Sequence, residues 1–132
     1  MDGRASHFIM QTAIAYSATD GGVIHIELDF KMITCYIKYI IDPNKIKEFE
    51  HYGKLWIPLV NKFGGKHQGY FLPSEGISNV AMALFSFPSL AEYEKYRKDS
   101  FQDEECLAAF EYAKKTKCII SYERSFFRPV LG

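Results

Sequence analysis

Two apolar runs separated by a turn occupy the middle of the chain, and the other predicted elements are arranged around them. Residues 67–72 and 79–87 form the two runs, and Pro-Ser-Glu-Gly at residues 73–76 lies between them. Proline, serine and glycine in so short a stretch are typical of a turn. The pattern therefore predicts two antiparallel strands at the centre of a sheet.

An earlier segment, residues 33–41, is apolar in both phases of a two-residue alternation, which is typical of a strand covered on both faces. Asp42 and Pro43 follow, and they suit the N-cap and the first position of a helix. The core-facing positions of this helix recur every three or four residues, at Ile46, Phe49, Gly53, Trp56, Val60 and Phe63, until two glycines at residues 64–65 end it.

Pro58 lies inside this predicted helix. Proline removes a backbone hydrogen bond from a helix interior, so we expect a bend near residues 56–58. The simpler interpretation is a bend that keeps the helix wrapped on a twisted sheet. The alternative is a bend that opens a gap for a ligand.

Capping signals define two more helices and a last strand. Ser89 and Glu92 form a capping box, which predicts a short helix over residues 90–98. A second helix begins near Asp103, with acidic residues at its start and lysines at its end; its buried stripe consists of Cys106, Ala109, Phe110 and Ala113. A β-branched and aromatic strand follows from Cys118 until Pro129 ends it. The order of elements predicts an α+β fold of the ferredoxin-like (split βαβ) type.

Residues 1–31 differ from the rest and form a predicted N-terminal extension. They are small and polar with scattered apolar positions, and residues 23–31 alternate between apolar and polar side chains. This period predicts one extra strand, which would add to the edge of the sheet. The segment is equally compatible with upstream sequence translated from a misassigned start, because Met32 opens the compact region.

Apolar residues on both faces of the predicted strands indicate a second subunit. Residues 80–87 carry apolar side chains in both phases, and the last strand has Ile119 on one face with Ile120, Tyr122 and Phe126 on the other. The helices cover only one face of the sheet, and exposing several such side chains on the other would forgo roughly 1.5–3 kcal/mol each. We therefore expect two subunits to pack their sheets together as a homodimer around a shared, barrel-like interior.

Composition, charge and cysteine content narrow the classes of function. The 132 residues suffice for one domain, and 16 basic residues cancel 16 acidic ones, so we expect no nucleic-acid partner. Three cysteines without paired spacing favour a reducing compartment. We expect no transmembrane segment and no secretory signal. These features predict a cytoplasmic protein, or a mitochondrial one in a eukaryote.

Five segments of the chain resemble the NIPSNAP family. They are ITCYIKYIIDP from residue 33, WIPLVNKFGG from residue 56, GYFLPSEGISN from residue 69, ALFSFPSLAEYEKYR from residue 83 and YERSFFRPV from residue 122. The resemblance implies a NIPSNAP-like domain over residues 32–130, folded as a ferredoxin-like subunit of a dimeric α+β barrel. Members of the family look like small homodimeric bacterial proteins or mitochondrial proteins linked to vesicular transport and mitochondrial quality control. The resemblance carries over no catalytic motif, and residues 1–31 depart from the family pattern.

Polar side chains near the central turn and on the last strand are the candidates for a ligand pocket. They are His67, Tyr70, Glu75, Asn79, Arg124 and Arg128. A histidine that titrates near neutral pH, close to a carboxylate and a guanidinium, could bind a small anionic or carbonyl compound or transfer a proton. The structural alternative is that Glu75 and Asn79 shape the turn, while an arginine pairs with a carboxylate to fix the dimer.

Other motifs that carry chemistry do not occur in the sequence. The glycines lack phosphate-loop spacing, no nucleophile elbow is present, and the histidines and cysteines do not fall at metal-ligand spacing. We therefore predict neither a metal nor a cofactor. The tyrosines, phenylalanines and Trp56 recur at core periodicities and are assigned to packing.

Two functions remain open from the sequence, and neither comes with assigned catalytic residues. The first is a NIPSNAP-type homodimer that acts as a binding or interaction protein, with a small-molecule ligand as a further partner. The second is a cofactor-independent, monooxygenase-like enzyme that acts on a small aromatic or carbonyl compound between the sheet and the helix that contains Pro58. The second rests on analogy of fold alone. An enclosed cavity of about 300 Å³ or more, lined by His67, Tyr70 or Arg124, would favour it.

Overall fold

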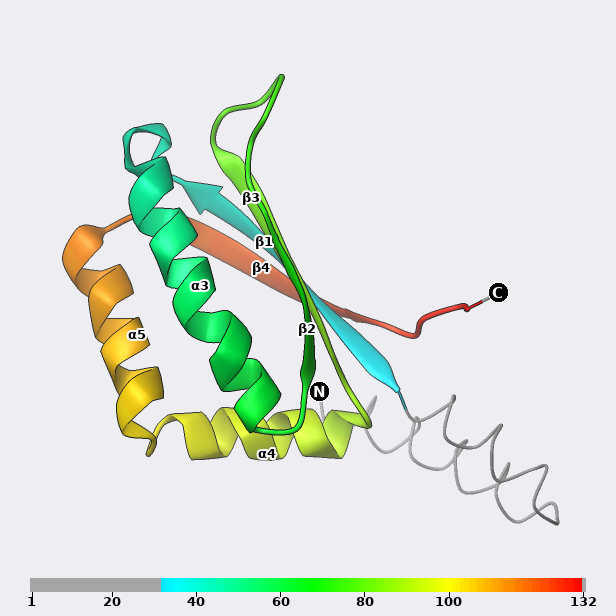
Figure 1. The fold of residues 1–132 in the computed structure, drawn as a ribbon. Coiled ribbons are helices and arrows are strands. Elements are labelled where there is room, and N and C mark those ends of the chain that lie inside the picture. Colours follow the sequence, from blue (N-terminus) through cyan, green and yellow to red (C-terminus); the bar gives the residue numbers. More distant parts are fainter. Residues whose placement is uncertain (1–31, 132) are drawn as a thin grey trace, which may run out of the picture.

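A computed structural model describes residues 32–131 of the chain. The elements follow the predicted order, as β1 (Ile33–Ile41), the 3-10 turn η1 (Pro43–Lys45), α3 (Ile46–Lys62), β2 (Lys66–Phe71), β3 (Val80–Phe87), α4 (Leu90–Ser100), α5 (Glu104–Thr116) and β4 (Ile119–Phe127). Figure 1 shows these elements packed as one α+β unit. The predicted extension at residues 1–31, with its strand at residues 23–31, lies outside the described residues.

The four strands form one antiparallel sheet in the order β2-β3-β1-β4. This order confirms the ferredoxin-like prediction. The expectation that both strands of the β2–β3 hairpin are central was wrong for β2, which is an edge strand. The reason is that β3 pairs with β1 on its other side, whereas β2 has β3 as its only neighbour among the described strands. The local pattern of a hairpin does not show which of its strands the rest of the sheet joins.

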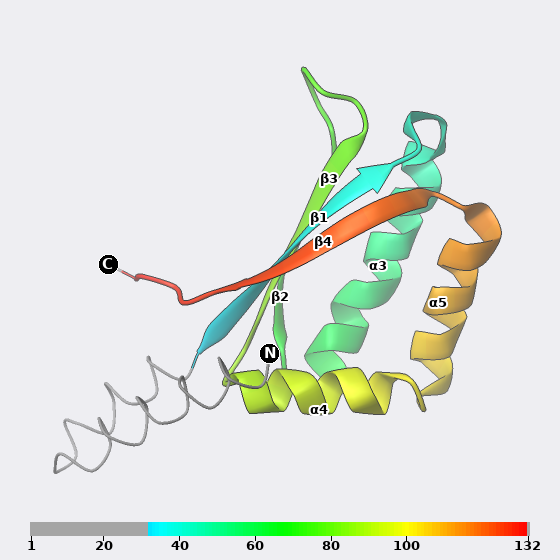
Figure 2. The same ribbon diagram turned by 180° about the vertical axis from the view of Figure 1, so that it is seen from behind.

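The helices lie on one side of the sheet, which divides the subunit into two layers. Helices α3 and α5 cover one face, and α4 runs across the end of the layer beneath them (Figure 1). From behind, the strands lie in front of all three helices and no described element covers them (Figure 2). The core between the layers is rich in aromatic residues, with Tyr39, Phe49, Tyr52, Trp56, Phe85, Phe87, Tyr93 and Tyr96 all buried.

The predicted capping residues set the ends of the helices. The Asp42 carboxylate accepts a hydrogen bond from the Asn44 N–H at 2.9 Å, and the Ser89 hydroxyl accepts one from the Glu92 N–H at 3.1 Å. Gly64 has φ +96°, the left-handed conformation that glycine adopts without strain after a helix. Helix α3 continues through Pro58 to Lys62. The bend at Pro58 stays a prediction.

A β-bulge in β4 decides which side chains face the helices. Ile40 pairs with Ser121 but Ile41 pairs with Ile119, so Ile120 is an extra residue on β4. Beyond the bulge, Tyr122 and Phe126 pair with the buried Tyr39 and Cys35 of β1. Four residues of β4 face the helices, namely Ile119, Tyr122, Arg124 and Phe126. The prediction that Tyr122 and Phe126 lie on the face opposite Ile119 was therefore wrong, because strict alternation ignores the extra residue.

The three cysteines Cys35, Cys106 and Cys118 are buried and form no disulfide. Burial raises the pKa of the Cys35 and Cys106 thiols to about 12. A thiol protonated at neutral pH is a weak nucleophile and metal ligand. These cysteines therefore act as small apolar side chains of the core.

Candidate functional site

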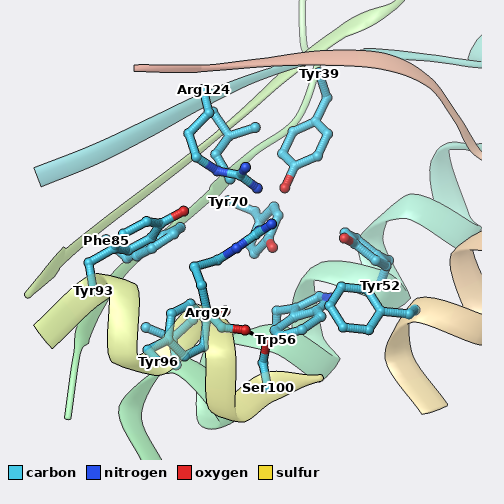
Figure 3. Close-up of a pocket in the computed structure, with 13 residues that line it drawn as sticks. Tyr39, Tyr52, Trp56, Tyr70, Phe85, Tyr93, Tyr96, Arg97, Ser100 and Arg124 are labelled. Atoms are coloured by element: carbon cyan, nitrogen blue, oxygen red, sulfur yellow. Dashed lines mark hydrogen bonds between the residues drawn. The ribbon is translucent and has the colours of Figure 1, made fainter. Parts of the chain in front are cut away.

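Two adjoining cavities lie between the sheet and the helices, and together they form the cleft. Figure 3 shows the residues that line the inner cavity. The inner cavity has a volume of about 40 Å³ and the outer cavity, which is partly open to solvent, about 430 Å³. Both are lined by Tyr39, Tyr52, Arg97, Phe110 and Arg124. The outer cavity is large enough for a small molecule, since typical ligand pockets have about 300–1,000 Å³.

Two arginines from different elements meet in the cleft. Arg97 comes from α4, where it lies one turn after Tyr93 on the side of the helix that faces the core, and Arg124 comes from β4 opposite Ile37. The guanidinium groups of the two arginines point toward the same space as the hydroxyl groups of Tyr39 and Tyr70 (Figure 3). The Arg124 Nε is buried and has no hydrogen-bond partner among the described residues. The cleft thus concentrates positive charge among aromatic rings.

The arginines also stack on rings of the outer cavity. The Arg97 guanidinium lies 5.4 Å from the centre of the Phe101 ring, and the Arg124 guanidinium lies 5.3 Å from the centre of the Tyr122 ring. Such cation–π contacts hold a guanidinium in place without neutralising its charge. Both groups therefore remain able to bind an anion.

The tyrosine hydroxyls of the cleft keep their protons near neutral pH. Burial raises the pKa of Tyr39 and of Tyr70 well above the ordinary value, and it raises the pKa of Tyr52 and of Tyr93 to about 12. The indole Nε1 of Trp56, which lines the inner cavity, is a buried donor without an acceptor among the described residues. The cleft is consequently rich in hydrogen-bond donors.

Of the predicted pocket residues, the structure brings Tyr70 and Arg124 into the cleft and places His67 directly behind Tyr70. The rings of His67 and Tyr70 stack at 5.0 Å with an interplanar angle of 14°. A second bulge, at Gln68 in β2, allows this, because His67 and Tyr70 would otherwise point to opposite faces of the strand. The His67 Nδ1 accepts a hydrogen bond from the Gly69 N–H at 2.9 Å, and Gly69 has φ +119°. His67 supports the wall of the cleft and does not line it.

A glycine of α3 makes room for Tyr70. A Cβ atom on Gly53 would lie 2.9 Å from the Cγ atom of the Tyr70 ring, closer than carbon atoms approach. The missing side chain lets the ring pack directly on the helix backbone and reach the inner cavity.

The other predicted pocket residues lie elsewhere. Glu75 is exposed in the loop between β2 and β3, and the Asn79 carbonyl at the end of that loop accepts a hydrogen bond from the Ile41 N–H at 2.8 Å. Arg128 is exposed just beyond β4. None of the three lines the cleft.

Sequence reasoning missed Arg97 and assigned the aromatic lining to packing. A signal for Arg97 was present, since Tyr93, Arg97 and Ser100 recur at helical spacing and an arginine on the buried side of a helix is unusual. No comparable signal separates Tyr39 or Phe110 from ordinary core residues.

The cleft has few groups of the kind that bind metals. Among the described residues, no aspartate, glutamate, histidine or cysteine lines either cavity. Within residues 32–131 no three such side chains gather closely enough to hold a metal ion. No helix in the same range has the length and apolar character needed to cross a membrane.

Comparison with known proteins identifies the family. The NIPSNAP family model matches residues 35–131, which is most of the chain. The chain belongs to the NIPSNAP family. A NIPSNAP family protein of unknown function from Agrobacterium tumefaciens has a similar fold, with a TM-score of 0.65 and 19% identity over 75% of this chain and 88% of that one. A NIPSNAP-like domain protein from Burkholderia xenovorans has a TM-score of 0.61 and 21% identity over 75% of this chain and 85% of that one.

The fold of this NIPSNAP chain is also similar to that of a protein with another family name. A protein from Nitrosomonas europaea, whose name suggests an antibiotic biosynthesis monooxygenase, has a TM-score of 0.58 and 7% identity over 75% of this chain and 90% of that one. Such low identity shows a shared fold and no more. A search of curated proteins finds no significant match.

Proposed function

We propose that this NIPSNAP chain is a homodimeric binding protein that holds a small molecule in the cleft. The observation that carries the proposal is the outer cavity of about 430 Å³, which has aromatic walls and a few convergent polar groups. That combination is typical of sites for small ligands. The inner cavity is too small for more than a few atoms of a ligand, so the ligand lies mainly in the outer one.

The chemistry of the lining supports binding more than catalysis. A general base must accept a proton near the working pH. The guanidinium groups stay charged, Tyr39 and Tyr70 keep their protons, and no carboxylate or imidazole from residues 32–131 lines the cleft. The residues of the cleft can therefore position and polarise a ligand, but none is suited to take a proton from it.

Filling the outer cavity tests this part of the proposal. Ala113 lines it, so Ala113→Phe should occupy the ligand's space, whereas Ala91→Phe changes an exposed residue of α4. A thermal-shift screen of small molecules should find compounds that raise the melting temperature of the unchanged protein and of Ala91→Phe, but not of Ala113→Phe. Compounds that stabilise all three proteins equally would place the binding site outside the cleft.

The face of the sheet away from the helices supports the homodimer. Tyr36, Ile40, Val80, Met82 and Leu84 share this face with Phe71 and Phe127. Met82 is 38% exposed, Phe71 45% and Phe127 54% in the single subunit. These apolar side chains come from all four strands and share the face with Lys38 and Glu123. An exposed apolar patch of this kind is characteristic of a surface that another protein covers. A second copy packed by two-fold symmetry places the same patch against itself.

An asparagine at the centre of this patch should weaken the dimer. Leu84→Asn would bury an amide without a partner at the interface, and we expect a dimer dissociation constant raised about tenfold or more. Leu107→Asn makes the same change at an exposed position of α5 and should have no effect. Sedimentation at micromolar concentrations measures both variants. A monomer in the unchanged protein at these concentrations would rule out the homodimer.

An enzyme of the monooxygenase type is the second candidate. One observation favours it, namely that the outer cavity exceeds about 300 Å³ and has Arg124 in its wall, although the cavity is partly open to solvent and not enclosed. In a reaction without cofactor, an activated CH₂ group of the substrate would react with O₂ to give a carbonyl group and water, with all electrons supplied by the substrate. Oxygen uptake with an enolisable aromatic ketone tests this candidate. Uptake no faster than in buffer alone would exclude such chemistry for that substrate class.

A further inference from the structure

We infer that the ligand of the cleft is a planar aromatic compound with an oxyanion, and that Arg97 and Arg124 hold the oxyanion between them. The inference rests on the proposed function, because it names the class of ligand for the same cleft. Three features of the lining support it, namely its positive charge, its excess of hydrogen-bond donors and its aromatic walls.

The charge of the cleft is positive and is not balanced within the described residues. Arg97, Arg124 and Lys114 line it, and no acidic residue of the part of the chain that the structure describes does. No ion pair within residues 32–131 involves Arg97 or Arg124. Lys62 is a contrast, since it binds Asp103 at 2.9 Å and Glu105 at 3.0 Å on the surface. A half-buried guanidinium without a carboxylate is unfavourable until an anion binds.

The polar groups of the lining require a ligand that accepts hydrogen bonds. Guanidinium and indole groups can only donate, and the phenolic hydroxyls keep their protons. The two guanidinium groups and the hydroxyls of Tyr39 and Tyr70 surround one space (Figure 3). A carboxylate or phosphate offers several acceptor lone pairs and suits the fork of an arginine. An oxyanion at this point would accept a hydrogen bond from the Arg124 Nε–H, which has no other partner among the described residues.

The walls of the outer cavity suit a ring. The Phe101 and Phe110 rings stack at 5.4 Å with an interplanar angle of 14°, and the Trp56 ring contacts Phe110 with centres 5.0 Å apart. Tyr39, Tyr52 and Tyr122 complete the aromatic lining. A flat ligand gains both apolar contact and stacking against such walls. An aliphatic acid would gain only the contact with the arginines.

Binding of matched probes tests the inference. The probes are 2-naphthoate, 2-naphthyl phosphate, the neutral 2-naphthamide and the non-aromatic cyclohexanecarboxylate, with calorimetry as the readout. The fluorescence of Trp56, which is the only tryptophan of the chain and lines the inner cavity, gives a second signal. We expect one or both naphthyl anions to bind about tenfold or more tightly than the amide and the aliphatic acid, and the tighter anion identifies the form of the oxyanion.

Arginine variants identify the groups that hold the anion. Arg124→Gln and Arg97→Gln should each weaken anion binding about ten- to hundredfold and leave binding of 2-naphthamide nearly unchanged. Arg128→Gln, at the exposed arginine beyond β4, should match the unchanged protein. Arg124→Lys keeps the positive charge but loses the planar guanidinium that can bind an oxyanion through two hydrogen bonds, so its affinity for the anions should be intermediate. The melting temperature of the ligand-free glutamine variants should stay equal or rise, because an unpaired charge is removed; a purely structural role would lower it.

Three results would overturn the inference. Equal binding of 2-naphthoate and 2-naphthamide, with no effect of Arg124→Gln, would show a neutral ligand; the proposed binding function would stand. Equal binding of cyclohexanecarboxylate and 2-naphthoate would remove the aromatic requirement. No saturable binding of any probe up to millimolar concentration would count against both the inference and the proposed function.

Discussion

Replacing Phe49 by alanine should lower the free energy of unfolding by about 3–5 kcal/mol. Phe49 is fully buried in α3, and its ring lies 5.0 Å from the ring of Tyr39 and 5.8 Å from the rings of Tyr52 and Tyr70. The change removes the apolar contact and leaves a cavity that the rigid neighbouring rings cannot fill. Urea denaturation at one fixed protein concentration measures the loss.

The same substitution at Phe101 is the matched control. Phe101 follows α4 in the chain and is 53% exposed. Its replacement by alanine removes mainly the contacts of its ring with Phe110 and with the Arg97 guanidinium. We expect Phe101→Ala to cost no more than about 1 kcal/mol. Equal losses for the two variants would contradict the central position of Phe49. The loss at Phe49 is also a large part of the roughly 5–15 kcal/mol by which domains are stable, so the variant should be close to unfolding at elevated temperature.

Acid should destabilise the fold through His67. Burial lowers the pKa of His67 to about 4, against 6.5 for an unperturbed histidine. The neutral ring also accepts the hydrogen bond from the Gly69 N–H at Nδ1, and protonation of that nitrogen would break it. Because the folded-state pKa lies below the unfolded one, the unfolded state binds more protons as the pH falls. The stabilising contribution of neutral His67 is therefore complete above pH 6.5 and is lost between pH 6.5 and pH 4.

The expected loss from His67 between pH 7 and pH 4 is about 2 kcal/mol, since one pKa unit corresponds to about 1.4 kcal/mol and the ring is partly exposed. Urea denaturation at a series of pH values measures it. His67→Gln should remove this part of the acid sensitivity, whereas His51→Gln, at an exposed residue of α3, should keep it. If His67→Gln had the same pH dependence as the unchanged protein, the low pKa of His67 would be wrong.

The fold could be predicted from the sequence because its signals are local. Asp42, Ser89 and Asp103 cap their helices through their own side chains, and Gly64 ends α3 by its own backbone conformation. The apolar pattern of residues 33–41 predicted a strand there, and β1 occupies these residues. Each of these features depends on residues within one turn or one strand, so the sequence contains it directly.

The cleft could be predicted only in part because its residues come together from distant elements. Tyr70 and Arg124 were chosen for their polar groups, and both line the cleft. Arg97 was missed although it faces them from α4. Glu75 and Arg128 lie near those residues in the sequence and were therefore predicted to share the pocket. In the structure, Glu75 lies in the loop between β2 and β3 and Arg128 lies beyond the end of β4, so both are exposed outside the cleft. The bulges at Gln68 and Ile120 have no sequence signal of their own, yet they decide which residues of β2 and β4 face the cleft.

The same two bulges also affect how copies of the chain can associate. They lie in β2 and β4, which are the two outermost of the four strands within residues 32–131. A bulge interrupts the regular row of backbone N–H and C=O groups with which an unpaired strand recruits another strand. Neither outermost strand thus offers a continuous template for open-ended, fibre-like growth. The proposed homodimer uses instead the side of the sheet away from the helices, where a two-fold pair closes on itself and growth stops at two copies.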